Sequence, residues 1–492
     1  MKLKGKISEL LIKKFNLALD KDYDISFIDA KKLFVLERID LVAKYQYVEA
    51  LNKKLDTNFF YEQYKATIEA FSNGKFYEPG DKDKNSFKKF DDIFKKLIED
   101  ISKKGFDKDE SVVPVAESGV IMDGAHRVAI SAFLNEKVPV VKIENGECCF
   151  DYKFFRNRML DEKYLDNMVF KYAEMKDNIY VVCLWPTCSK NQQKEISEYI
   201  NGKFKVVYEK DVDFSYNGLK NFMSQVYYEQ DWIGDLENGY KGVQAKVNLC
   251  YKDGRPTHII VIEEKDIDKI VKEKANIRKK IGIGNHSIHS TDDHVETMRM
   301  LSLVLNENSI KFLNKSDPYK YKYPTRELRK IKTELEKRHI PVGSIVIDSG
   351  SVLALYGLRP SDDIDVLIDN KYLEKGKDFL DLHNEGIDFY KTSLDDLLYN
   401  PDNYFYYEGI KVMSPERLLI MKKNRVGKKD LEDVKRLLSL LDKKQSKLLV
   451  FKTTVRRKMN HAKYRTATVV VPMLKKTGTY DWLKKIIYRG KR

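Results

Sequence analysis

Residues 345–368 read IVIDSGSVLALYGLRPSDDIDVLI and decide the fold of the second half of the chain. The apolar runs 345–347 and 364–367 have the length and β-branched composition of short buried strands. Gly350 and Ser351 lie between them, where a turn would open a helix. The stretch therefore predicts a strand, a turn with a helix, and a second strand packed beside the first.

Two acidic side chains open the second of these strands. Because side chains alternate along a strand, Asp363 and Asp365 are expected to project from one face. If no cation is present, repulsion between the two carboxylates would raise the pKa of one of them well above its usual value of about 4. Carboxylate pairs of this kind bind hard divalent cations. Gly350 would let the backbone approach a phosphate, and Ser351 could donate a hydrogen bond to it.

This pattern resembles that of the DNA polymerase β type nucleotidyltransferase superfamily. In that family a glycine and a small residue precede an Asp-hydrophobic-Asp strand by a short gap, and here eleven residues separate Ser351 from Asp363. Ser349 departs from the family, which usually has an apolar residue before the glycine. The resemblance implies transfer of an NMP group from an NTP with Mg²⁺ or Mn²⁺ at Asp363 and Asp365. The alternative is a solvated turn followed by an edge strand with a chance Asp-x-Asp.

The resemblance also implies a third carboxylate on a following strand. Asp388 in the segment 386–390 has the placement and alternation for this role, although helix caps and turns use the same residue type. Lys422, on an amphipathic helix further along, could contact the triphosphate or simply face solvent. Three other acids compete with Asp388: Asp395, Asp396 and Asp402.

A second motif lies far upstream, in residues 112–143, VVPVAESGVIMDGAHRVAISAFLNEKVPVVKI. The pattern predicts a strand, a turn, a helix that starts at Asp-Gly-Ala-His-Arg, and another strand. It resembles the ParB/sulfiredoxin fold, whose Gly-x-His-Arg motif sits at a helix start. The resemblance implies an anion or ATP site at Gly124, His126 and Arg127. Ala125 stands where the sulfiredoxin branch has a cysteine, which disfavours that chemistry.

Two nearby acids keep a kinase hypothesis open. Glu117 and Asp123 have the chemistry of metal ligands or of a general base, so this region could phosphorylate a small molecule with ATP. The alternative is structural, with His126 and Arg127 tying the helix start to the sheet.

Length and pattern predict an α/β (α+β) multidomain protein, since 492 residues correspond to about three domains. We expect a ParB/sulfiredoxin-like domain with a helical extension at 1–165 and a mixed α/β region at 175–318. A nucleotidyltransferase domain at 320–442 and a basic helical tail at 443–492 would follow. Within the central region, residues 245–264 predict two strands joined by a turn at 252–254.

The central region also holds three of the eight histidines, His286, His289 and His294, beside two aspartates. Imidazole and carboxylate groups bind zinc or manganese, but the spacing matches no helix-borne zinc motif. A helix cap explains the same residues. Lys246, Lys274 and Arg278 could accompany the loop as anion ligands or face solvent.

The C-terminal tail carries the charge. The chain has a formal net charge of +15, and residues 443–492 alone contain sixteen Lys or Arg and one acid, Asp481, which gives 16 − 1 = +15. Apolar residues interleave with these cations. The tail therefore predicts contact with an anionic membrane surface, with nucleic-acid binding and packing on the protein as alternatives.

Several classes of protein are disfavoured. The sequence has no apolar run of the roughly 18 residues that a membrane span requires. Lys13 and Lys14 interrupt the first apolar stretch, so it does not resemble a signal peptide. Five cysteines without a CxxC pair indicate a reducing compartment. These features predict a cytoplasmic protein, with peripheral contact at the inner face of the membrane through the tail.

The combined prediction is a magnesium-dependent nucleotidyltransferase that acts on a small phosphorylated or hydroxyl acceptor. The pairing of the two resemblances suggests surface-polysaccharide precursor synthesis as the setting. Two alternatives remain: an ATP-dependent small-molecule kinase that uses the ParB-like domain, and a nucleic-acid-directed defence or toxin-antitoxin nucleotidyltransferase.

Overall fold

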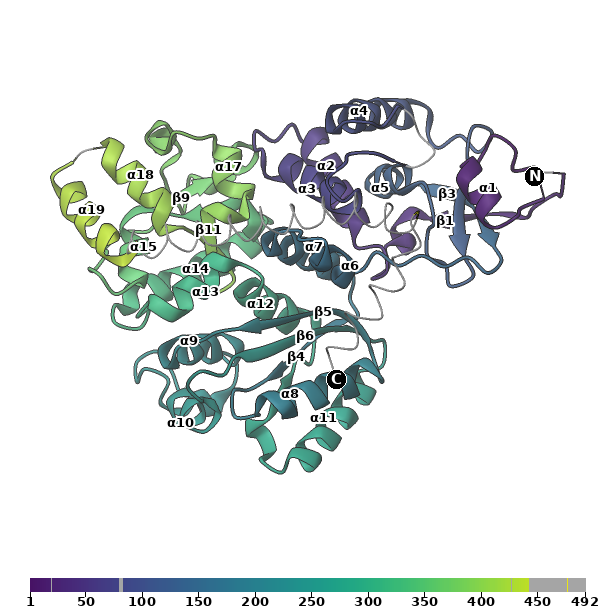
Figure 1. Cartoon of the computed structure of the whole chain (residues 1–492). Helices are drawn as coiled ribbons and strands as arrows, with labels where there is room; N and C mark the ends of the chain where they lie inside the picture. Colours follow the sequence, from purple (N-terminus) through teal and green to yellow (C-terminus); the bar gives the residue numbers. More distant parts are fainter. Residues whose placement is uncertain (19, 79–82, 426, 442–475, 477–492) are drawn as a thin grey trace.

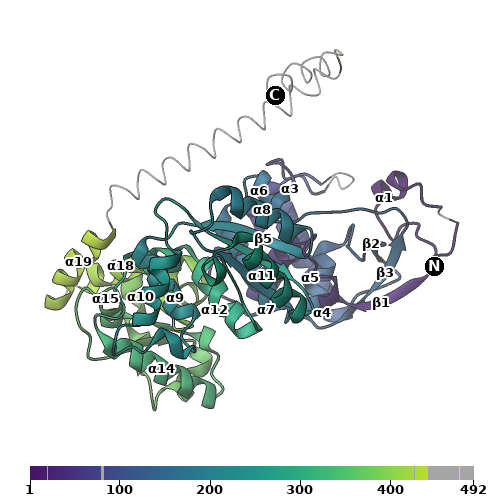
Figure 2. The ribbon, with the colours of Figure 1, turned by 90° about the horizontal axis from the view of Figure 1, so that it is seen from below.

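The computed structural model describes residues 1–18, 20–78, 83–425, 427–441 and 476. It is a mixed structure of 53% helix and 14% strand with three small sheets, which confirms the α/β multidomain class. Figure 1 shows three lobes, each built around one sheet. Figure 2 shows the N-terminal sheet and the last described helix at opposite ends of the molecule.

The N-terminal part has a three-stranded sheet in the order β1-β3-β2, where β1 is Ile25–Asp29, β2 Val113–Ala116 and β3 Lys137–Ile143. Strand β2 runs parallel to β3, and β1 runs antiparallel to it. The segment between β2 and β3 forms the helix that the sequence predicts. The helices of this part are α1 (Glu9–Lys14), α2 (Asp40–Asn52), α3 (Phe59–Phe71), α4 (Phe87–Lys104), α5 (Ala125–Phe133), α6 (Tyr152–Asn157) and α7 (Glu162–Glu174).

The central part is an antiparallel sheet in the order β5-β6-β4-β7. Its strands are β4 (Ile179–Leu184), β5 (Lys205–Val212), β6 (Thr257–Glu263) and β7 (Ile288–Ser290). Its helices are α8 (Lys190–Asn201), α9 (Tyr216–Val226), α10 (Lys241–Cys250), α11 (Ile267–Ile281) and α12 (His294–Val304). The prediction of two strands within 245–264 is wrong in its first half, because residues up to Cys250 belong to α10.

The C-terminal part has five strands in the order β10-β9-β8-β12-β11. The strands are β8 (Ile345–Ile347), β9 (Asp365–Ile368), β10 (Asp381–Leu382), β11 (Tyr404–Tyr407) and β12 (Ile410–Met413). Strand β8 pairs antiparallel with β9, which pairs in parallel with β10. The helices are α13 (Glu307–Lys315), α14 (Lys322–Lys337), α15 (Ser349–Leu355), α16 (Leu373–Gly376), α17 (Leu394–Tyr399), α18 (Pro415–Arg425) and α19 (Lys428–Leu441).

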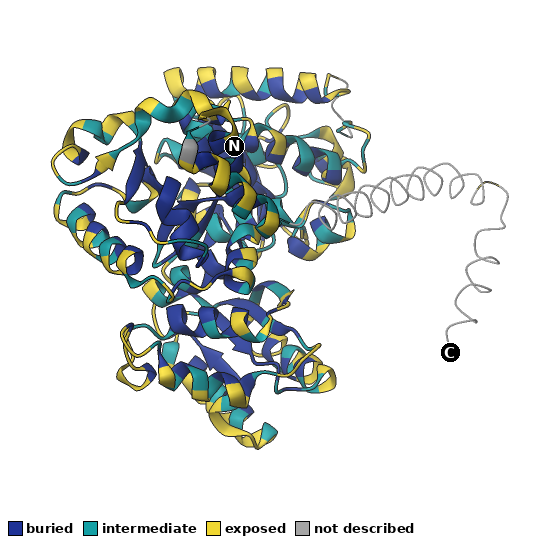
Figure 3. Cartoon of the chain, turned by 90° about the vertical axis from the view of Figure 1, so that its left-hand side faces the viewer, coloured by how far each residue is buried: buried dark blue, intermediate teal, exposed yellow. Residues whose placement is uncertain are grey.

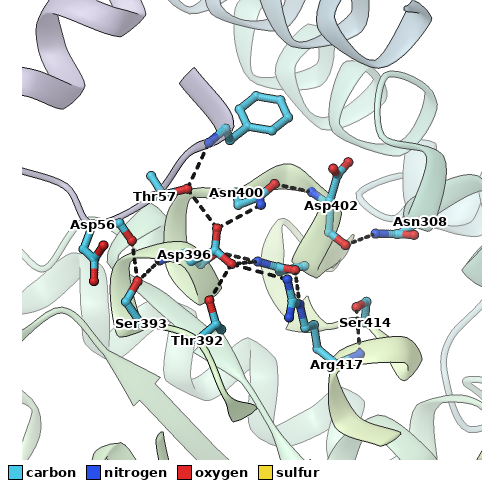
Figure 4. A network of polar contacts seen from close by, with 12 residues as sticks. Asp56, Thr57, Asn308, Thr392, Ser393, Asp396, Asn400, Asp402, Ser414 and Arg417 are labelled. Atoms are coloured by element: carbon cyan, nitrogen blue, oxygen red, sulfur yellow. Dashed lines mark hydrogen bonds and ion pairs between the residues drawn. The ribbon is translucent and has the colours of Figure 1, made fainter. Parts of the chain in front are cut away.

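The three parts pack into one body. Val140, Val181 and Val346, one from each sheet, belong to a single cluster of buried apolar residues. Figure 3 shows the buried residues gathered in the interior and the exposed ones on the outer faces of the helices. A polar contact adds to it, because the loop before α3 places Asp56 and Thr57 against α17, and the Thr57 hydroxyl donates to Asp396 over 2.9 Å (Figure 4).

No helix among the described residues is both long and apolar enough to cross a bilayer. The basic tail lies outside the described residues apart from Lys476. The prediction that this tail contacts a membrane therefore concerns a part of the chain that the structure does not describe.

Candidate functional site

The acidic pair lies at the start of β9, as the sequence predicts. Asp363 is exposed, whereas Asp365 is buried on the strand. Two serines hold Asp363 in place: Ser361 donates to its carboxylate over 2.9 Å, and Ser351 donates to its carbonyl over 3.0 Å. Burial raises the pKa of Asp365, and the negative charge of Asp363 raises it further, while His383 opposes both. The strand therefore presents two interacting carboxylates.

The neighbouring strand adds two more ligand groups. Strand β10 pairs in parallel with β9, and its register places Asp381 beside Asp365. The ligand atoms of Asp365, Asp381 and His383 all lie within 4.8 Å of one another. His383 Nε2 is 3.2 Å from the Asp365 carboxylate. Two carboxylates and an imidazole are a donor set that suits Mn²⁺, Mg²⁺ or Zn²⁺.

The expected third ligand, Asp388, is not on a strand. Residues Asn384–Tyr390 form a 3₁₀ helix, η6, so the prediction of a strand at 386–390 is wrong. The physical reason is the side chain of Asn384, which accepts from the N–H of Ile368 and donates to its carbonyl over 3.0 and 2.8 Å. These bonds take the place of further backbone pairing with β9, and β10 ends at Leu382. Asp381 therefore occupies the position on the adjacent strand that we assigned to Asp388.

Sequence reasoning missed Asp381 and His383. The Asp-Leu-His triplet at 381–383 has the alternation of a strand that places both polar groups on one face. That signal is short, because β10 contains only two residues. The three competing acids lie elsewhere: Asp395 and Asp396 contact Asp56 and Thr57, and Asp402 pairs with Lys163.

The glycine turn packs against the loop that leads to the acids. A Cβ on Gly350 would lie 2.7 Å from Ser361 Oγ and 3.4 Å from the guanidinium of Arg359, so only glycine fits without a shift. Ser349 has a φ of +54°, a conformation that costs energy in a residue with a side chain. Ser351 is fully buried. The turn that should approach a phosphate thus lies under Arg359 and Ser361, next to Asp363.

The sequence predicts Lys422 either at the triphosphate or facing solvent, and the structure shows it in neither place. Its ammonium is buried and lies 3.0 Å from Asp430 and 3.3 Å from Asp433, two carboxylates of α19. The helix α19 folds back on α18 and encloses the lysine. Arg359 and Arg425 also pair with these two acids and remain partly exposed. Their charges reach Asp363 and Asp365 respectively, so they are the cations that flank the acidic strand.

The ParB-like motif lines a separate cavity of about 970 Å³. Gly124, with φ of +83°, precedes α5, and Asp123, His126 and Arg127 all line the cavity. Burial holds the pKa of His126 well below its usual value, and Lys44 adds to this effect, so the ring is neutral near pH 7. Its Nε2 lies 2.9 Å from the Tyr64 hydroxyl. Arg127 has no carboxylate partner among the described residues.

Glu117 does not line this cavity. The Ala116 N–H donates to Val120 over 2.8 Å, which closes a tight turn with Glu117 exposed at its tip. The predicted second site therefore contains four of its five residues in one place. A buried ion-pair network lies on another wall, where Asp40 accepts from Arg38 over 2.8 Å and from Lys44 over 2.7 Å.

The central histidines do not share a site. His289 bonds Glu296 over 3.0 Å, His286 faces Cys250, and His294 is the first residue of α12. Within the described part of the chain, the Asp365 group alone brings three metal-binding side chains together. The hypothesis of a metal bound by these histidines therefore gains no support.

Comparison with known proteins leaves the family open. No model of a known protein family matches the chain, and no curated protein matches its sequence.

Proposed function

We propose that the chain is a magnesium-dependent nucleotidyltransferase that moves an NMP group from an NTP to a small phosphorylated or hydroxyl acceptor. The observation that carries the proposal is the group of Asp365, Asp381 and His383 on adjacent strands, with Asp363 two residues away. The resemblance of the Gly-Ser and Asp-x-Asp motifs to the polymerase β type superfamily supports the same chemistry.

Each residue has a role in this proposal. Asp365, Asp381 and His383 would hold the ion, with Asp363 beside them as a further carboxylate, and the ion when bound would neutralise the triphosphate and lower the pKa of the attacking group. Ser351 and Ser361 fix the position of Asp363 through its carbonyl. Arg359, beside Gly350, would contact phosphate oxygens as a planar donor. His383 orients Asp365 through their 3.2 Å contact.

The proposal is tested by product analysis. The full chain is incubated with Mg²⁺, each NTP and a panel of sugar phosphates, polyol phosphates and tRNA, and products are followed by ³¹P NMR. We expect pyrophosphate together with a new phosphodiester or pyrophosphate linkage on one acceptor. Loss of both signals in Asp365→Asn would assign them to this site. A sugar phosphate or polyol phosphate as acceptor would indicate precursor synthesis, whereas tRNA would indicate a nucleic-acid-directed reaction.

A second candidate function rests on the ParB-like cavity. Its volume suits a nucleotide, and Arg127 has no carboxylate partner among the described residues. A kinase at this site would release ADP instead of pyrophosphate. ADP that persists in Asp365→Asn and disappears in Arg127→Met would favour this second candidate.

A further inference from the structure

A group of basic and aromatic side chains in the central domain plays no part in the proposed transferase. They come from five separate segments: Tyr227 after α9, Trp232 in η2 (Asp231–Ile233), Lys246 in α10, Arg278 in α11 and His286 in η3 (Gly284–His286). Figure 1 shows α9 and α10 together at one end of the central sheet. The fold therefore brings residues that are far apart in the sequence to one location.

Lys246 has aromatic neighbours and, among the described residues, no acidic partner. Its ammonium lies 5.6 Å from the ring centre of Tyr227 and 5.8 Å from that of Trp232, and it donates to the carbonyl of Asn285 over 3.1 Å. It pairs with no carboxylate among the described residues. Burial lowers its pKa, and the charge of Arg278 lowers it further. Lys246 and Arg278 donate to the carbonyls of Asn285 and Ile288, three residues apart in the chain, so the two cations lie near each other.

Arg278 is also incompletely bonded. One terminal nitrogen donates to the carbonyl of Ile288 over 3.2 Å, but its Nε is buried without a hydrogen-bond partner. A buried donor of a charged group is costly to leave unpaired. Burial lowers the pKa of His286, and the positive charge of Lys246 lowers it further. The location therefore gathers Lys246, Arg278 and His286, whose acceptors are backbone carbonyls and a thiol instead of carboxylates.

No carboxylate among the described residues forms an ion pair with Lys246 or Arg278. Burial raises the pKa of Cys250 to about 11 and that of Cys183 well above its usual value, so both thiols are neutral at pH 7. Glu296, the nearby acid, bonds His289 over 3.0 Å and the N–H of Asp292 over 2.8 Å. Glu296 is thus engaged by His289 and Asp292 and pairs with neither Lys246 nor Arg278.

We propose that Lys246 and Arg278 bind the phosphate group of a phosphorylated ring compound, whose ring lies on Trp232. Phosphate oxygens would accept from the terminal guanidinium nitrogens of Arg278 and from Lys246 Nζ, the strongest class of hydrogen bond in proteins. Trp232 is 44% exposed and meets Tyr227 edge-on with 5.1 Å between the ring centres, so its indole offers an apolar ring surface beside Lys246. This binding site does not depend on the proposed transferase.

The test is calorimetric titration of the full chain with orthophosphate, glucose 1-phosphate and AMP. EDTA is present so that metal-dependent binding does not contribute. We expect wild type and Lys279→Met, an exposed neighbour of Arg278 on α11, to bind at least one probe. Lys246→Met and Arg278→Met should each weaken that binding roughly tenfold or more, the effect of losing a charge-assisted hydrogen bond. Arg278→Lys, which keeps the charge, should retain part of the affinity.

Two further readouts separate this site from the alternatives. Trp232→Ala should weaken glucose 1-phosphate or AMP and leave orthophosphate unchanged, because it removes only the surface for the ring. Thermal midpoints without ligand should not fall in Lys246→Met, since the change relieves repulsion. Absence of binding to wild type at millimolar concentrations, or binding lost only in Arg127→Met, would overturn the proposal.

Discussion

Lys422 shows how burial decides what a single side chain can do. Lys422→Met should destabilise the protein by about 3 kcal/mol, the lower end for breaking a buried ion pair, because Arg359 and Arg425 still face the two carboxylates. Urea unfolding measures this loss. The KM for NTP should change little in the folded fraction.

Lys423→Met is the matched control, since the adjacent lysine is exposed. It should leave both stability and KM near wild type. If Lys422→Met had normal stability and a greatly raised KM for NTP, Lys422 would contact the triphosphate after all.

The sequence predicts that Asp363 and Asp365 open a strand and that Gly350 lies in a turn, because their spacing and the flanking apolar runs are local signals. It was insufficient for Asp381 and His383, whose position depends on pairing between β9 and β10. It was misleading for Asp388, because side-chain bonds from Asn384 end the strand and start η6. No local sequence pattern predicts a hydrogen bond between a side chain and the backbone of a neighbouring strand.

Strands β5 and β6 are joined by a titratable contact. His258 on β6 lies 2.6 Å from Asp211 and 3.6 Å from Glu209, both on β5. Burial alone would lower the pKa of His258, but these acids raise it to about 9. The contact therefore stabilises the fold fully below about pH 6.5, the unfolded value. This contribution is lost as the pH rises through 9.

We expect stability to fall by about 2 kcal/mol between pH 6.5 and 9.5, less than the full shift implies because Asp211 is mostly exposed. His258→Gln should abolish this slope in urea unfolding. His339→Asn, an exposed histidine in a left-handed conformation, is the control and should keep it. An equal slope in His258→Gln would show that other groups cause it.

Helix α10 illustrates why element prediction failed in the central domain. Residues 245–250 alternate apolar and polar side chains as a strand would, but Val243, Val247 and Cys250 form one buried face of a helix. Tertiary packing overrides the local period. By contrast, β8 and β9 are buried on both sides, and their continuous apolar runs identified them correctly.

The three domains form one packed unit, and Asp396 is central to the polar contact between the first and the last (Figure 4). Its carboxylate accepts from five side chains: Thr57, Thr392, Asn400, Asn403 and Arg417. Thr57→Val should cost about 1.5 kcal/mol, the value of one hydrogen bond to a charged group. Asp396→Ala should cost more, because it leaves all five donors without this acceptor.

Differential scanning calorimetry checks this prediction. We expect Asp396→Ala to lower the midpoint and to split the N-terminal and C-terminal domains into separate transitions. Asp378→Ala, which removes an exposed acid, should behave as wild type. A single unshifted transition in Asp396→Ala would show that the apolar core alone joins the domains.

The most direct test of the proposed metal centre compares two exposed aspartates of the same segment. Pyrophosphate release with Mg²⁺ and the productive NTP and acceptor is measured for Asp381→Asn and Asp388→Asn. We expect a loss of roughly a hundredfold or more in Asp381→Asn, as for a lost metal ligand. Asp388→Asn should remain close to wild type. Normal release by Asp381→Asn together with an inactive Asp388→Asn would contradict the metal centre proposed here.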